Sequence, residues 1–251
     1  MLSFDAAGAG SPVLLLHSSV CDARMWDPVW APLTGAHRAI RCDFPGSGRT
    51  PLPAGTFCVA DDVRDLLDSL DLDRVSLVGS SYGGRIALEV ASTWPERVER
   101  LALLCAATDA PPSPEFEALD EEETALLEAG DVDGAVELNV RTWLGPEASE
   151  QTRAAVRAMQ RQSFEMWLAA DPEPEHRHRD IALDRITAPA LVVSGAHDLP
   201  DFREGAAHLI AALPSARGVE LPWAGHLPSL ERPDEVAALL LDFLAERPSA
   251  R

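Results

Sequence analysis

The sequence predicts an α/β protein with a doubly wound, mostly parallel sheet and an inserted helical cap. Short apolar runs without polar alternation recur along the chain, as expected for strands that are buried on both faces. Segments with apolar residues at helical spacing separate these runs, which indicates parallel strands joined by right-handed crossovers. The alternation stops near residue 109 and resumes near residue 185, so the helices between these points interrupt one sheet.

The elements of the first part follow in order along the chain. Strands are expected at 12–17, 39–42, 75–78 and 101–105, and helices at 25–33, at 61–72 and from the end of the third strand to about residue 94. The segment before residue 12 is expected to be a short terminal extension. In the helix at 61–72, the apolar positions Val63, Leu66, Leu67 and Leu70 recur at the period of an amphipathic helix.

The segment 109–184 is expected to be the helical cap. It begins with a proline-rich linker, continues with predicted helices near 115–129, 132–143 and 147–169, and ends in a polar stretch at 171–180. No part of it is typical of a strand. The core is therefore assigned to 1–108 and 185–251, where a strand at 190–195, a helix at 203–213, a strand at 218–221 and a helix at 233–246 restore the alternation.

The composition of the chain argues against some classes of binding partner. The chain has 251 residues and is 46% hydrophobic, enough to bury a full core. With 41 acidic and 21 basic residues its formal charge is −20, which argues against nucleic acid or an anionic membrane as a partner. The four cysteines show no spacing typical of a metal site. We expect a cytoplasmic protein that acts on a small molecule without a metal or cofactor.

The segment 79–84 carries the main chemical signal. Gly79-x-Ser81-x-Gly83 lies between a predicted strand and a predicted helix, the context of a nucleophile elbow. Such a turn strains the serine backbone and brings the helix close to the strand, so its neighbours must lack a Cβ atom. The pentapeptide alone also fits an ordinary glycine-rich turn, whereas strand before and helix after favour Ser81 as a nucleophile.

A serine hydroxyl needs a base, and the base needs an orienting acid. Asp198 and His226 each follow a predicted strand, and they follow Ser81 in the order serine, acid, histidine. Asp198 alone could cap a helix and His226 alone could be a solvated loop residue, but their joint order favours a catalytic triad. Asp109 is a rival, less favoured position for the acid.

The oxyanion hole is expected to use two backbone N–H groups. One belongs to Tyr82, the residue after the nucleophile, and the other to the loop after the first long strand. Ser19 is the preferred second donor, with Ser18 and Val20 as alternatives in the same loop.

These motifs resemble those of the α/β-hydrolase superfamily, specifically its small cap-bearing bacterial serine hydrolases. The matching stretches are His17-Ser-Ser-Val, Trp26-Asp-Pro, Asp43-Phe-Pro-Gly-Ser-Gly-Arg, Gly79-Ser-Ser-Tyr-Gly-Gly, Gly195-Ala-His-Asp and Gly225-His-Leu-Pro-Ser-Leu-Glu-Arg-Pro. The family usually has glycine where this chain has Ser18, which puts the geometry of the oxyanion loop in question. The resemblance implies the α/β-hydrolase fold and acyl transfer to water through an acyl-serine intermediate.

The predicted activity is hydrolysis of an ester or lactone of a small, mostly apolar molecule. Perhydrolysis by the same triad and ligand binding without turnover are the alternatives. Arg24, Trp143 and Trp167 are candidate substrate contacts, although a solvated surface position is favoured for the arginine and the cap core for the two tryptophans. Arg85, Arg141, Arg157 and Arg161 are further candidate anchors for a carboxylate substrate, and a solvated position is favoured for them too. His176 and His178 are interpreted as residues of a solvated linker. The oligomeric state is not indicated by the sequence.

Overall fold

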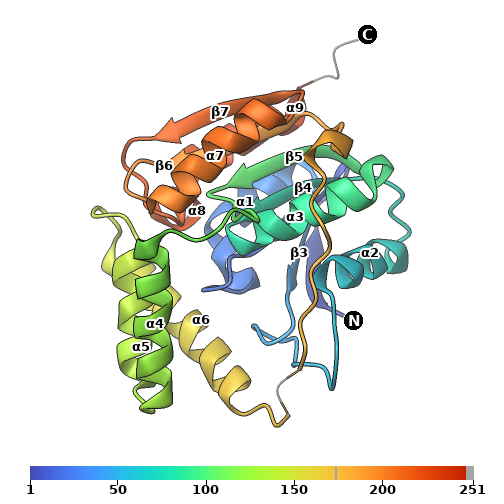
Figure 1. Ribbon diagram of the computed structural model, residues 1–251. Coiled ribbons are helices and arrows are strands. Elements are labelled where there is room, and N and C mark those ends of the chain that lie inside the picture. The colour runs from blue at the N-terminus through green and yellow to red at the C-terminus, as the bar shows by residue number, and fades with distance from the viewer. Residues whose placement is uncertain (173, 247–251) are drawn as a thin grey trace.

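A seven-stranded sheet forms the centre of the protein, for which a computed structural model describes residues 1–172 and 174–246 (Figure 1). The strand order is β1-β3-β2-β4-β5-β6-β7, and all neighbours are parallel except β1 and β3. The strands are β1 (Ser3–Ala7), β2 (Pro12–Leu16), β3 (Arg38–Asp43), β4 (Val75–Ser80), β5 (Val98–Leu104), β6 (Ala190–Gly195) and β7 (Ala216–Leu221). The predicted fold class is confirmed.

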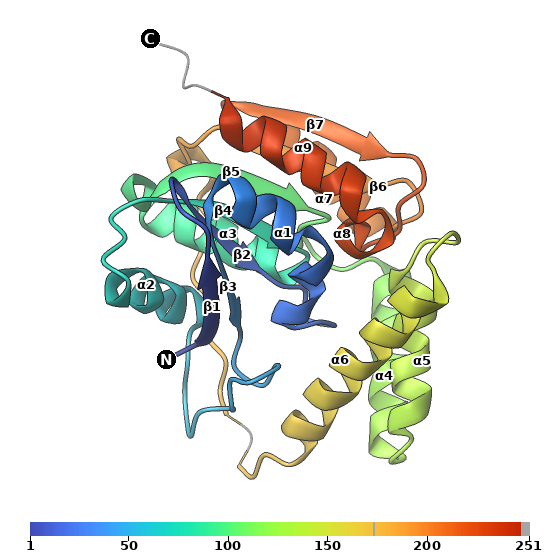
Figure 2. The same cartoon turned by 180° about the vertical axis from the view of Figure 1, so that it is seen from behind.

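Helices cover both faces of the sheet. Alternate residues of β2 enter opposite cores, Val13 and Leu15 on one face and Leu14 and Leu16 on the other. The first face packs against α1 (Asp27–Ala36) and α9 (Pro233–Ala245), and the second against α2 (Val59–Ser69), α3 (Tyr82–Thr93) and α7 (Pro200–Ala212), as Figures 1 and 2 show. This arrangement explains why the strand sequences are continuous apolar runs.

Three helices of the inserted segment stand beside the core (Figure 2). They are α4 (Pro114–Glu128), α5 (Val132–Trp143) and α6 (Glu150–Leu168), and the side chains of Ser113, Asp131 and Ser149 cap their N-termini. The later part of the segment runs along α2 and α3: the Arg177 N–H donates to the Phe57 carbonyl, and Ser92 Oγ donates to the Asp180 carbonyl. The cap proper therefore consists of α4 to α6.

Some short elements were not predicted. β1 is an antiparallel edge strand whose outer residues are exposed, so it lacks the apolar run that marks the central strands. The one-turn helices are η1 (Ala23–Trp26), η2 (Pro95–Arg97), η3 (Leu183–Arg185) and α8 (Pro228–Glu231), each too short for a periodic pattern. In the described part of the chain, no helix combines the length and the apolar character needed to cross a bilayer.

Two glycines allow β4 and α3 to approach each other and β2. A Cβ atom at Gly79 would lie 2.3 Å from the Gly83 carbonyl oxygen, and one at Gly83 would lie 2.2 Å from the Leu16 oxygen. Both obstacles are backbone atoms, which cannot move aside as a flexible side chain can. The spacing of these glycines around Ser81 is thus required by close packing.

Gly83→Ala is expected to destabilise the protein by about 2–3 kcal/mol, because the added methyl group must displace the end of β2. Urea unfolding at pH 7.5 measures the change. Gly35→Ala is the matched control: its Cβ atom would have no neighbour within 4 Å in helix α1, so stability should stay the same or rise slightly. Equal loss in both variants would contradict the packing argument.

Candidate active site

Ser81 occupies a strained turn between β4 and α3. Its φ and ψ angles are 52° and −117°, in the left-handed half of the map that non-glycine residues rarely adopt. Hydrogen bonds hold this geometry: the Ser81 N–H donates to the Leu104 carbonyl at 2.9 Å, and the Ser81 carbonyl accepts from Ala107 at 3.0 Å. The conformation predicted from the glycine pattern is therefore present, supported by the neighbouring strand β5.

Asp198 and His226 form a buried hydrogen-bonded pair. His226 Nδ1 lies 2.7 Å from Asp198 Oδ2, and the other carboxylate oxygen accepts from the Leu199 N–H at 2.8 Å. Asp198 follows β6 and His226 follows β7, so both lie at the carboxyl end of the sheet. Within the described residues no hydrogen bond joins Ser81 Oγ to His226, a contact that often forms only when substrate is bound.

Aromatic rings enclose the imidazole of His226. The ring of Phe202 lies 4.1 Å from it and that of Trp143 lies 4.6 Å from it, measured between centroids. The His226 N–H also donates to the Trp143 carbonyl at 2.9 Å. The last helical residue of α5 thus contacts both the ring and the backbone of the histidine.

Glu231 holds the loop that carries His226, although the sequence analysis did not select it. Its carboxylate accepts from the N–H groups of Gly225 and Leu227, on either side of His226, and from Gly145 in the cap. Burial raises the pKa of this carboxyl group. The available sequence signal was a glutamate five residues after the histidine, before the last helix.

Glu231→Gln is expected to lower kcat about 10- to 100-fold, because an amide offers only one acceptor oxygen and the His226 loop loses its fixed position. Ester hydrolysis at saturating substrate measures this effect. Glu147→Gln is the control, since Glu147 is exposed and pairs only with Arg232. A Glu231 variant as active as that control would show that the loop keeps its place without the carboxylate.

The loop after β2 is held by His17. The Phe44 N–H donates to His17 Nε2 at 2.9 Å, so Nδ1 carries the proton that is donated to the Ser18 carbonyl at 2.8 Å. Burial lowers the pKa of His17 and keeps its imidazole neutral. Ser18 is fully buried and has a negative φ, so this position does not require glycine. Ser19, the preferred oxyanion donor, is exposed to two cavities.

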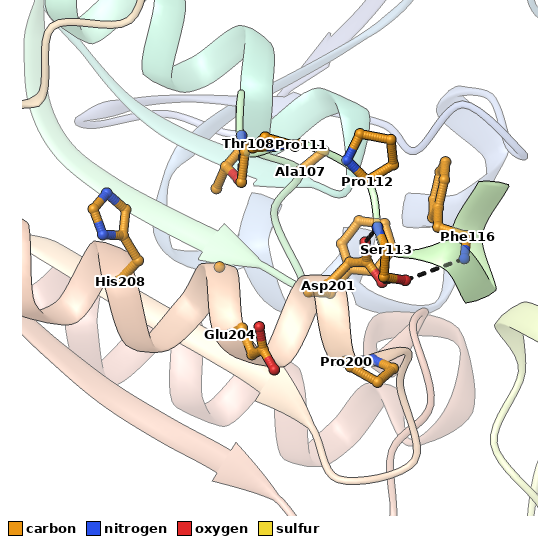
Figure 3. A pocket seen from close by; sticks show the side chains of 13 residues that line it. Ala107, Thr108, Pro111, Pro112, Ser113, Phe116, Pro200, Asp201, Glu204 and His208 are labelled. Atoms are coloured by element: carbon orange, nitrogen blue, oxygen red, sulfur yellow. Dashed lines mark hydrogen bonds between the residues drawn. The ribbon is translucent and has the colours of Figure 1, made fainter.

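These two cavities share Ser19, Ser163 and Trp167. The cap cavity, about 380 Å³, extends among α4, α5 and α6, and the core cavity, about 210 Å³, extends toward Phe57, Tyr82 and His176. A larger hollow of about 680 Å³ lies between the linker 107–113 and α7, where Asp201 accepts hydrogen bonds from Ser113 (Figure 3). That hollow lacks Ser19 and Tyr82, so the two smaller cavities are the better substrate sites.

His176 lies in the wall of the core cavity, not in a solvated linker as interpreted from the sequence. Its Nε2 atom is 3.1 Å from the Tyr82 hydroxyl, and its ring stacks on Phe57 with a centroid distance of 4.7 Å. His178 Nδ1 lies 2.8 Å from the fully buried Glu89 carboxylate. These contacts come from Phe57, just before α2, and from Tyr82 and Glu89 of α3, all far away in sequence, so local polarity could not reveal them.

Burial and the neighbouring His178 lower the pKa of His176 to about 4. Since an unfolded histidine binds a proton near its ordinary pKa of 6.5, stability is expected to fall as pH drops from about 6.5 to about 4. His176→Gln should flatten this part of the curve in urea unfolding at several pH values. His208→Gln, which changes an exposed histidine of α7, should leave the slope as in the wild type.

The candidate arginine anchors are all engaged by carboxylates. Arg24 is bound by Asp22 and Gln162 and lines neither of the two cavities. The other four pairs are Arg85–Glu89, Arg141–Glu122, Arg157–Glu137 and Arg161–Asp133. Trp143 and Trp167 do line the cap cavity, where contact with substrate stays a prediction. Asp109, the rival acid, is an exposed linker residue.

Cys105 lies next to the acid–base pair. Its sulfur, Asp198 and His226 present ligand atoms within 4.8 Å of one another. Burial raises the pKa of the thiol, which keeps it protonated, and Sγ lies 3.7 Å from the Gly225 carbonyl oxygen. A protonated thiol is a poor metal ligand.

The seven-stranded, mostly parallel sheet with helices on both faces has the architecture of an α/β hydrolase. The sequence model described as "Alpha/beta hydrolase family" matches residues 13–239. The chain belongs to this family, as its motifs predicted.

Three similar proteins from the comparisons carry names of hydrolases or lactone-degrading enzymes. A 2-hydroxy-6-oxononadienedioate/2-hydroxy-6-oxononatrienedioate hydrolase of Paraburkholderia phymatum is 31% identical over 97% of this chain and 90% of its own length. The enol-lactonase of Burkholderia xenovorans is 27% identical with a TM-score of 0.81, over 98% and 96% of the two chains. Est816, an N-acyl homoserine lactone degrading enzyme, is 26% identical with a TM-score of 0.76 over 96% of both chains.

Proposed function

We propose that this hydrolase cleaves an ester or lactone through an acyl-serine intermediate, with Ser81 as nucleophile, His226 as base and Asp198 as orienting acid. The observation that carries the proposal is the buried hydrogen bond of 2.7 Å between His226 and Asp198. That bond leaves His226 Nε2 free to accept a proton, and Ser81 is the strained residue of the elbow at the end of β4, two strands away from β6 in the sheet.

In the first half of the reaction, His226 Nε2 takes the proton of Ser81 Oγ as this oxygen attacks the carbonyl carbon of the substrate. The negative charge that develops on the carbonyl oxygen is accepted by the N–H groups of Ser19 and Tyr82. Asp198 stabilises the imidazolium. The tetrahedral intermediate then collapses, the C–O bond to the alcohol breaks, and the departing oxygen takes the proton from His226.

In the second half, His226 removes a proton from water as the water oxygen attacks the acyl carbon. Collapse of this second intermediate returns the proton to Ser81 Oγ and releases the carboxylic acid. The helix dipole of α3, which begins at Tyr82, favours the anionic intermediates at its N-terminus.

The cavities favour this substrate class over the acid named for the Paraburkholderia phymatum relative. A dioate carries two carboxylates, whereas among the described residues no arginine or lysine lines the cap cavity or the core cavity. Aromatic rings form part of both walls. A neutral ester or lactone group fits these surroundings better than a dianion.

Labelling with a fluorophosphonate probe, followed by peptide mass spectrometry, tests the proposal. The expected result is a single modification at Ser81, together with hydrolysis of p-nitrophenyl esters or simple lactones by the unlabelled protein. An unreactive Ser81 would favour the alternative of ligand binding without turnover. A rate that depends on added peroxide and a carboxylic acid would instead favour perhydrolysis.

A further inference from the structure

The cap cavity combines aromatic rings with carboxylates. Its aromatic residues are Phe116, Trp143, Phe164 and Trp167, and its acidic residues are Asp120 and Glu123. None of the residues that line it is lysine, arginine or histidine. Aromatic faces and carboxylates both attract cations, because the face of a ring carries partial negative charge.

Glu123 is the acidic group held most firmly in this wall. It is only partly exposed, burial raises the pKa of its carboxyl group, and it forms no ion pair within the described residues. Its Oε2 atom accepts from Asn139 Nδ2, while Asn139 Oδ1 accepts from Trp143 Nε1 at 2.6 Å. These bonds orient Glu123 and leave Oε1 without a partner among the described residues.

Gln160 provides a second, independent observation in the same cavity wall. Its side chain is 5% exposed and lines the same cavity, but its Oε1 atom has no hydrogen-bond partner in the described part of the protein. Buried amide oxygens are nearly always paired, so this unpaired oxygen needs a partner, and a bound molecule that carries a donor or a positive charge would supply one.

We propose that the cap cavity binds an organic ammonium group, so that the preferred substrate is an ester whose alcohol half carries a positive charge. That the bound molecule is an ester rests on the proposed function. Cation–π contact with the four rings and attraction to Glu123 supply the recognition. The formal charge of −20 adds a long-range field that draws cations toward the protein.

The position of Trp143 assigns the ammonium to the alcohol half. Its ring lies in the wall of the cap cavity and also 4.6 Å from the ring of His226. His226 delivers the proton to the departing alcohol, so an alcohol that leaves beside this imidazole can extend past Trp143 into the cap cavity. The acyl half is left with the smaller core cavity of about 210 Å³.

Butyrylcholine and 3,3-dimethylbutyl butyrate test the inference, because they differ only in a quaternary nitrogen replaced by carbon. Titration of the released acid should give the wild type a kcat/KM about tenfold higher for the choline ester. Glu123→Gln keeps an acceptor for Asn139 and should reduce this ratio about fivefold or more. Glu122→Gln is the matched control, since exposed Glu122 pairs with Arg141; its ratio should change less than twofold.

Binding of the two product alcohols provides a measurement that does not need turnover. Calorimetry should show choline binding about tenfold more tightly than 3,3-dimethylbutanol to the wild type, with this preference lost in Glu123→Gln. If choline binds in this way and neither ester is cleaved, the ammonium site stands and the hydrolase assignment fails. Equal affinities or equal kcat/KM values in the wild type, or equal effects of the two glutamine variants, would overturn the ammonium site.

Discussion

Ser81→Ala is expected to lower kcat for ester hydrolysis by about four to six orders of magnitude, the loss seen when a serine nucleophile is removed. Without Oγ no acyl-serine can form, and only the oxyanion donors and the binding cavities remain. Alanine has the same backbone restrictions as serine, so the strained φ of 52° and the fold should be retained. Initial rates with a p-nitrophenyl ester at high enzyme concentration measure the residual activity.

The neighbouring serine provides the control. Ser80 is fully buried in β4, and its Oγ has no hydrogen-bond partner in the described residues. Ser80→Ala therefore removes an unpaired hydroxyl without changing the elbow, and its activity should stay within about threefold of the wild type. Wild-type rates in the Ser81 variant would eliminate the acyl-serine mechanism and with it the proposed function.

Asp198→Asn is expected to reduce kcat about 10⁴-fold, as in serine hydrolases where an amide replaces the orienting acid. The amide removes the negative charge that stabilises the imidazolium. It can also present an N–H to His226 Nδ1, because the Leu199 N–H competes for the amide oxygen. The imidazole would then carry its proton on Nε2, where it cannot accept one from Ser81. Single-turnover acylation with a p-nitrophenyl ester measures this step.

Asp109→Asn is the matched control, because Asp109 was the alternative candidate for the orienting acid. It is exposed in the linker after β5, whereas Asp198 is hydrogen-bonded to His226. We expect its kcat to remain within about twofold of the wild type. A larger loss in the Asp109 variant than in the Asp198 variant would reverse the assignment of the acid.

The sequence predicted the central strands and the core helices closely, because burial on both faces leaves a strong apolar pattern. The strand at 190–195 coincides with β6, and the helix at 233–246 differs from α9 by one residue. The helix predicted at 203–213 begins three residues too late, because α7 starts at Pro200. Edge strand β1 was missed because half of it faces solvent and its pattern is weak.

Contacts between segments that are distant in the chain could not be predicted from the sequence pattern. Arg24 was a candidate substrate contact, but its guanidinium pairs with Asp22, two residues earlier, and donates a hydrogen bond to Gln162 from α6. His176 lies in a proline-containing polar stretch, yet its ring contacts Tyr82 of α3 and stacks on Phe57, which lies just before α2. Local polarity says whether a segment can be solvated, not whether another segment covers it.

By itself, the sequence determined the fold class, the strained position of Ser81 and the order of Asp198 and His226. Periodicity, glycine spacing and strand ends are local properties of the sequence. Because the strands are parallel, the residues that follow them lie at one edge of the sheet. The tertiary structure alone revealed Glu231 beneath the His226 loop, the neutral histidines at the core cavity, and Glu123 among the rings of the cap. These arrangements join side chains from separate elements, so their charge and burial exist only after the chain has folded.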